Sequence, residues 1–485
     1  MLKDIMKKEI LEHLLSSKFV FMFIICSVLI MLSIYVGVGT YLADKKVYDD
    51  DLAWDALAMQ PPQTYQQLLD GALKVYRAPR PLGSLVKGVE DAAGRVSLTN
   101  KTETSLGGSK YQSNPLMAVF GVFDLMFIVK MVLSLFAILL IHDTICGEKE
   151  KGTLKLTLSN SVPRDRLLLG KVIGGYISLI IPLLLPLLLG LIYLSLHPGI
   201  DLTGEDWQRL GFIFLMFLLY LSVFFCLGLL VSSMTLRSST SLLVLLFVWS
   251  VWGIVVPKAS VIIAGMLRPI PVANEIYTQK MMTSAQIRWE VIEEFIPQLS
   301  EVGVKVQNTP SGWTMTTSGQ TNLDAYRVIN QEMTSESLRR VDENNAKIDR
   351  EYQLKKDAQA ALAKSIARIS PTSAMTFGAT TLAGTGPEDY NRFWKAVMDY
   401  KPVVDNWLRT NPDLRGPAPK PGPGVVGPFK EIDSATIAGM PQPAIGPEDL
   451  NRSIMRILPD LISMILMIFF LTGGTYFTFI RYDVR

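Results

Sequence analysis

The sequence predicts an α-helical polytopic membrane protein with six transmembrane helices and a large, mostly helical extracytoplasmic domain. Hydrophobic residues make up 49% of its 485 residues, and the mean hydropathy of +0.29 is high for a chain with 19% charged residues. The apolar residues gather in blocks of about 20 residues or more, the length that a helix needs to cross about 30 Å of hydrocarbon. Stretches of ordinary soluble composition separate the blocks, so membrane and extramembrane parts alternate along the chain.

An amphipathic segment opens the chain. Across residues 1–17 the apolar side chains fall roughly on one helical face and most charged side chains fall elsewhere, which predicts a cytoplasmic interface helix. The following block, 18–42, predicts the first span. A cleaved signal is disfavoured, because the apolar core exceeds the usual length of roughly 7–15 residues and acidic residues precede it.

Five further apolar blocks predict the remaining spans, at 116–142, 166–196, 207–233, 238–264 and 456–480. Prolines interrupt the third of the six spans and predict kinks there, and a glycine pair in the last span is typical of close helix packing. These residues are Pro182, Pro186, Gly473 and Gly474.

Two long polar insertions, 43–115 and 265–455, separate the spans. Within the second, apolar residues recur near heptad spacing and predict a long helix over 323–369, which packs either in its own domain or against a second copy. The stripe consists of Leu338, Val341, Ile348, Tyr352, Leu362, Ile366 and Ile369. The proline- and glycine-rich stretch 411–447 predicts an extended connector.

The distribution of basic residues predicts the topology. Lysines and arginines gather in the N-terminal segment, in 143–165 and in the C-terminal tail, whereas the short loop with Asp201, Glu205 and Asp206 is acidic. By the positive-inside rule both termini are cytoplasmic and both insertions are extracytoplasmic. We therefore expect a multi-pass protein of a prokaryotic cytoplasmic (inner) membrane.

Motifs for catalysis or metal binding are missing from the sequence. No phosphate-binding G-x-x-x-x-G-K-[ST] motif occurs, since Gly170-Lys171-Val172 lacks both the hydroxyl and the upstream glycine. The three histidines and three cysteines show no metal-ligand spacing, and we expect the cysteines to be buried or reduced thiols. They are His13, His142, His197, Cys26, Cys146 and Cys226. The net charge of +3 does not indicate nucleic acid, so we expect neither an enzyme nor a bound cofactor in this chain.

The loop between the second and third spans carries the strongest functional signal. Residues 143–165 are charged and contain a short predicted helix that begins at Thr153. Glu148 and Glu150 precede it, where carboxylates favour the positive end of the helix dipole. By itself this pattern fits any positively charged cytoplasmic loop with a capped helix.

The loop resembles the hallmark loop of the ABC-2 family of transporter permeases. The family has a Glu-rich turn before Gly-Thr, an element with Ser, Pro and Arg, and a Leu-x-Gly-Lys element, which correspond here to 148–153, 159–164 and 168–171. Six spans and an N-terminal interface helix also match. The insertion before the last span departs from the short re-entrant loop of simple members and is similar to a variant with a long helical insertion.

The resemblance implies the permease subunit of an ATP-driven ABC-2 type transporter, an exporter, with ATP and Mg bound by a separate ABC ATPase subunit. In the family a coupling helix in this loop sits in a cleft of the ATPase, and the interface helix would be a second contact. The residues implied are Glu148, Glu150, Gly152, Thr153, Ser159, Pro163 and Arg164. A second permease copy, as a homodimer or a closely related heterodimer, is also implied.

Two other functions stay open. The large insertion suggests an ATP-driven mechanotransducer that relays motion to an extracytoplasmic partner. A membrane receptor or scaffold without an ATPase is the third hypothesis. The sequence does not specify a substrate: ions, peptides, lipids and antibiotics all stay open.

Lys130 is a second departure from the family and lies near the middle of the second predicted span, where a lysine costs about 3 kcal/mol. It either lines a pathway for an anionic or polar substrate or has a structural role. The structural role would be an ion pair between helices, with Asp124 or Asp460, or a charge shielded at a subunit interface.

Overall fold

The structure is a computed structural model whose described residues divide into two compact units. The first comprises Met1–Pro257 and Arg368–Arg485, and the second comprises Lys258–Ala367. The residues described are 2–58, 63–64, 73–99, 104–113, 121–159, 163–309, 312–317, 322–410, 431–432, 441, 443 and 445–481. Almost all of the predicted connector 411–447 lies outside them.

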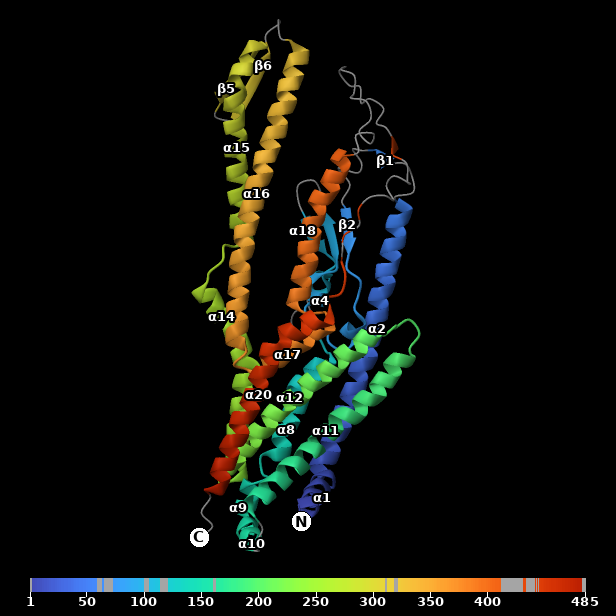
Figure 1. Cartoon of the computed structure of the whole chain (residues 1–485), viewed down its shortest axis with the longest axis vertical. Helices are drawn as coiled ribbons and strands as arrows, with labels where there is room; N and C mark the ends of the chain where they lie inside the picture. Colours follow the sequence, from blue (N-terminus) through green and yellow to red (C-terminus); the bar gives the residue numbers. More distant parts are fainter. Residues whose placement is uncertain are drawn as a thin grey trace. The chain divides into compact units, whose positions relative to one another are not determined.

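Six helical stretches among the described residues are long and apolar enough to cross a membrane, which confirms the predicted fold class. A short helix, α1 (Leu2–Leu14), precedes them (Figure 1). The six are α2 (Ser17–Ala58), the run of α7 (Leu125–Phe127), η2 (Ile128–Leu133), α8 (Ser134–Ile141) and α9 (Cys146–Glu150), α11 (Arg164–Leu196), α12 (Gly204–Met234), the run of α13 (Ser238–Ser250), η3 (Val251–Val255) and α14 (Val256–Leu267), and α20 (Leu450–Ile480).

Two helix boundaries differ from those of the predicted spans. α2, which contains the predicted span 18–42, continues to Ala58, since 43–58 contains neither proline nor glycine to break the helix. The second span does not start at 116, because residues 121–124 are not helical and Asp124 caps the helix. Its carboxylate accepts a 2.8 Å hydrogen bond from the Phe127 amide.

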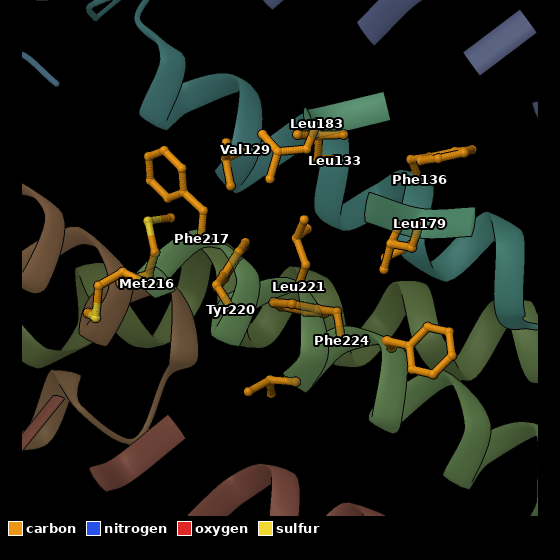
Figure 2. Packing of buried hydrophobic residues seen from close by; sticks show 14 of the residues in the cluster. Val129, Leu133, Phe136, Leu179, Leu183, Met216, Phe217, Tyr220, Leu221 and Phe224 are labelled. Carbon is orange, nitrogen blue, oxygen red and sulfur yellow. The ribbon is translucent and has the colours of Figure 1, made fainter. Parts of the chain in front are cut away.

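The core of the first unit lies between η2–α8, α11 and α12. Figure 2 shows apolar side chains from these elements facing one another. The members labelled there are buried: Val129, Leu133, Phe136, Leu179, Leu183, Met216, Phe217, Tyr220, Leu221 and Phe224. Gly228 permits the close approach of α12 and α8, because an added Cβ would lie 2.0 Å from Ile141 Cγ2. Such dense packing makes these helices a rigid body.

The described part of the first insertion packs on α2. β2 (Leu73–Tyr76), β3 (Val96–Thr99) and β4 (Thr104–Gly107) form an antiparallel sheet, accompanied by η1 (Pro81–Ser84), α4 (Glu90–Ala93) and α5 (Lys110–Ser113), while β1 (Gln63–Thr64) pairs with β7 (Glu431–Ile432). Arg95 fastens this segment to α2 through an ion pair of 2.9 Å to Asp44, and it also pairs at 3.1 Å with Glu90 of α4. Gly37 gives η1 its place on α2, because a Cβ there would lie 1.9 Å from the Ser84 carbonyl oxygen.

The predicted insertion 265–455 is not one domain. α17 (Pro371–Ala383) belongs to the first unit, is buried over most of its length and packs against α12 and α20 (Figure 1). α18 (Pro387–Thr410) follows it in the same unit. Ser370 caps the start of α17, and Gly384 ends it with a left-handed φ of 69°. The small side chains of α17 suit this burial among larger helices.

The second unit is built on α15 (Ala273–Glu301) and α16 (Leu323–Ala367), joined through the antiparallel pair β5 (Val304–Thr309) and β6 (Gly312–Thr317). α16 packs against α15, with Met333 in one core with Phe295 and Leu299. Of the two packing arrangements predicted for the long helix, the structure has the one within its own domain. Leu338, expected in the packed stripe, is 51% exposed.

Candidate functional site

The elbow, residues 143–165, joins the second and third spans through two short helices. α9 is followed by a turn at Gly152, whose φ of 73° lies in the left-handed region that favours glycine. α10 (Thr153–Ser159) comes next, and Pro163 precedes the first residue of α11. The predicted short helix is therefore present, with a sharp reversal at its start.

Lys171 holds the elbow to the rest of the molecule. It lies about two turns into α11, and the residue is only 2% exposed. The ammonium donates 2.8 Å hydrogen bonds to carboxylate oxygens of both Glu9 on α1 and Glu148 on α9, and a 3.5 Å bond to the Thr144 carbonyl. All three ammonium donors thus have acceptors, one on α1 and two in the elbow. The buried cation joins α1, the elbow and α11.

Glycines bring α1 against α11 at the same place. A Cβ on Gly170 would lie 2.5 Å from Ile5 Cγ2, and a Cβ on Gly174 would lie 2.9 Å from Glu9 Cβ. The two glycines are four residues apart, the spacing that lets two helices approach closely in a membrane. This close approach brings the Glu9 carboxylate within reach of Lys171.

His13 stands beside the same cluster on α1. Burial lowers the pKa of His13, and the nearby carboxylate of Glu9 only partly opposes this. The imidazole is therefore neutral at pH 7. Lys171 is therefore the cation that pairs with both Glu9 and Glu148.

A second set of bonds fixes α9 to the turn between α12 and α13. The Glu150 carboxylate accepts from the Ser238 amide at 3.0 Å and from its hydroxyl at 2.9 Å. Lys149 donates to the carbonyls of Ser233 and Thr235, and the Ser232 hydroxyl accepts from two amides of the elbow. α9 is consequently tied to two places in the helical core.

The other predicted elbow residues shape its ends. The Thr153 hydroxyl donates to the Glu148 carbonyl at 3.3 Å, and the Ser159 hydroxyl closes the end of α10 on the Leu156 carbonyl at 2.8 Å. Arg164 donates to the Ile480 carbonyl at 2.5 Å, which places the start of α11 against the end of α20. The prediction that Glu148 and Glu150 serve the dipole of the short helix is wrong, since both lie in α9 and bond elsewhere.

The exposed side of α10 is apolar at one point and basic around it. Leu154 is buried, whereas Leu156 is 67% exposed. Lys151, Lys155 and Arg166 are exposed near it in sequence. Leu156 therefore lies exposed on α10 with exposed basic residues on both sides of it in the sequence.

A family model described as "ABC-2 family transporter protein" matches residues 4–484. The chain belongs to this family. It is therefore a membrane transport subunit rather than itself a catalyst, and membership implies a partner ATPase. No curated protein matches the permease.

Lys130 of the permease lies in η2, five residues after the first residue of α7, so the prediction of a mid-span position is wrong. Both carboxylates predicted as partners are bound elsewhere. Asp124 caps α7 and accepts from the Lys87 amide at 3.1 Å, and Asp460 pairs with Arg368 at 2.6 Å. Within the described ranges no carboxylate lies at ion-pair distance from the Lys130 ammonium.

Sequence reasoning missed Lys171 and Glu9 as parts of the site. Lys171 entered the prediction only as a positive-inside charge and as part of a motif, and Glu9 only as a residue of the polar face. Two signals could have identified them: a lysine at the start of an apolar span that requires counter-charges, and the Gly170–Gly174 spacing beside it.

Proposed function

We propose that the permease is the transmembrane subunit of an exporter and that a separate ABC ATPase drives it through the elbow. The observation that carries the proposal is the bonding of Lys171. Because one buried ammonium joins α1, α9 and α11, a displacement of the elbow is passed directly to the third span and the interface helix. Transmission of this displacement needs a rigid connection. The hydrogen bonds of Glu150 and Lys149 provide a second rigid connection, from the elbow to α12 and α13.

The surface of α10 specifies the kind of cleft that receives it. Leu156 is the apolar anchor, and the exposed basic residues Lys151 and Arg166 are suited to an acidic rim. Glu148 and Glu150 bond to Lys171 and Ser238 of the permease itself, and these bonds hold α9 in position. The contact therefore rests on an apolar pocket with carboxylates around it on the ATPase.

Leu156→Glu should lower the amount of ATPase that co-purifies with the permease at least tenfold, because a carboxylate would enter an apolar pocket with an acidic rim. Leu338→Glu is the matched control, since Leu338 is also an exposed helical leucine but lies in the second unit. The control should retain the ATPase. Equal retention by both variants, at equal expression, would refute the docking surface.

We further propose that two copies of the permease assemble. The most apolar windows of α2 and α20 bury only 28% and 17% of their residues within the chain, against 67% for α12. Lipid and a second copy would share these uncovered faces. An ATPase that closes as a dimer would then receive two elbows.

A second candidate, the ATP-driven mechanotransducer, is favoured by the second unit, which is compact by itself and contains the 45-residue α16. The exporter predicts ATP-dependent flux of substrate into sealed vesicles. It also predicts that Lys130→Leu abolishes this flux while ATP hydrolysis persists, because an uncompensated cation beside the helical core would guide a polar or anionic substrate. Normal function after the central pathway is sealed by cross-linking would favour the mechanotransducer.

A further inference from the structure

Two of the spans contain a π-helical turn. In η2 the Ser134 amide donates to the Val129 carbonyl, and in η3 the Val256 amide donates to the Val251 carbonyl, so both bonds reach back five residues instead of four. A π-turn inserts one extra residue into a helix and is frequently found at functional sites. Both of these turns lie within apolar spans.

The same position in each turn is bound from outside the helix. In each turn it is the carbonyl of the residue that follows the acceptor of the five-residue hydrogen bond. The Lys130 carbonyl accepts from the Tyr220 hydroxyl of α12 at 2.8 Å, and also from Ser134 of its own helix at 2.6 Å. The Trp252 carbonyl accepts from the Ser370 hydroxyl at 2.5 Å.

The start of α17 contacts both of these bonds. Ser370, which binds Trp252, is also the N-cap of α17, and its hydroxyl accepts from the amides of the first turn. Two residues later the Thr372 hydroxyl lies 3.4 Å from the hydroxyl of Tyr220, which binds Lys130. All five residues belong to the first unit. One helix end therefore meets the π-turns of two different spans.

The physical need for these hydroxyls follows from the membrane. In hydrocarbon each backbone carbonyl must find a donor inside the protein. A π-turn interrupts the regular pattern of backbone hydrogen bonds and leaves a carbonyl without its amide donor. A hydroxyl from a neighbouring element can donate to that carbonyl instead. Without this hydroxyl the regular α-helical hydrogen-bond pattern is more favourable. The π-turn would then revert to an α-helix, with one side of the span shifted by one residue. That change rotates one side of the span against the other by about 100° and shifts it by about 1.5 Å.

We propose that the N-terminal end of α17 is a latch that holds the second and fifth spans in their π-register. Tyr220 and Ser370 are its positioning residues, and through η2 the latch fixes the direction in which Lys130 points. Withdrawal of α17 removes the Ser370 hydroxyl from the Trp252 carbonyl. It also removes the Thr372 hydroxyl from beside Tyr220, so that Tyr220 can turn away from the Lys130 carbonyl. Each span then changes register by one residue. The helix that follows the second unit thereby controls the geometry of two spans.

The test measures which face of the helix is exposed to lipid on each side of η2, in the full-length protein in lipid vesicles. The direction of this face around the helix axis is called the phase. Spin labels are placed singly at 125–129 and at 135–141, and their accessibility to oxygen is recorded. In Tyr220→Phe/Ser134→Ala the phase difference between the two sides should change by about 100°, whereas Ser134→Ala alone should keep the native value. A change in the single variant, or none in the double variant, overturns the latch.

α12 offers a matched control. The Leu218 carbonyl accepts from the Tyr176 hydroxyl at 3.1 Å and from Ser222 at 2.8 Å, the same residue types, but in a regular α-helix. Tyr176→Phe/Ser222→Ala should leave the phase of α12 unchanged, and a change there would mean general loosening and would contradict the proposal. Ser370→Ala is the second arm, with labels at 241–250 and 256–263 on either side of η3. It should change that phase difference by about 100°, and a native value would refute the role of Ser370 even if the double variant failed to fold.

Discussion

Lys171→Met should lower the free energy of unfolding of the permease by about 3–5 kcal/mol, because it leaves two carboxylates in a buried site without their cation. Glu9 and Glu148 each bond the lysine at 2.8 Å, and Lys171 itself is almost completely buried. Methionine matches the shape of the lysine stem, so lost packing contributes little. Thermal and denaturant unfolding of the purified protein in detergent would measure the effect.

The charge origin of this loss can be separated from a steric one. In Lys171→Met/Glu9→Gln/Glu148→Gln all three charges are removed, and most of the stability should return, since neutral amides bear burial far better than unpaired carboxylates. Wild-type stability in the single variant, or no recovery in the triple variant, would contradict the proposed role of Lys171. ATPase coupling should still be impaired in the triple variant, because the charged link between α1, α9 and α11 is gone.

Gly152→Pro should reduce co-purification of the ATPase at least tenfold while the membrane helices stay folded. Proline fixes φ near −65°, whereas Gly152 has φ of 73°, so the turn between α9 and α10 cannot form and α10 is presented in a different direction. Nothing lies within 4 Å of a Cβ placed at this position. The substitution therefore acts through the backbone alone, and thermal unfolding of the spans should change little.

Gly152→Asn is the control for this prediction. Asparagine adopts the left-handed region more readily than other residues with side chains, and the space around Gly152 is open, so the turn should be kept. The asparagine variant should bind the ATPase nearly as well as the wild type. If the proline variant binds equally well, the elbow is not the contact.

The spans and the short elbow helix were predictable because each depends on local pattern. Apolar length alone indicates a membrane helix, and the turn residues around Thr153–Ser159 indicate a short one. The span 18–42 follows from hydropathy, but hydropathy does not give the end of the helix that contains it. A helix can continue beyond its apolar stretch as long as no residue breaks it, as α2 does up to Ala58.

The partners of charged residues could not be predicted. Glu148 and Lys171 are 23 residues apart and Glu9 and Lys171 are 162 apart, and only the packing of α1 on α11 brings them together. The proposed pairing of Lys130 with Asp460 failed for the same reason, since Arg368 occupies that carboxylate. Helical periodicity gives the face on which a charge lies but not the element that covers this face.

The sequence by itself determined that this protein has six membrane spans and a charged elbow with a short helix between its second and third spans. Length, hydropathy and turn chemistry are properties of consecutive residues, so they can be read without the fold. Only the tertiary structure decided that Lys171 joins three elements and that α17 enters the helical core beside two π-turns. Those features arise from contacts between residues far apart in the chain, and close packing selects such contacts only when the whole unit has folded.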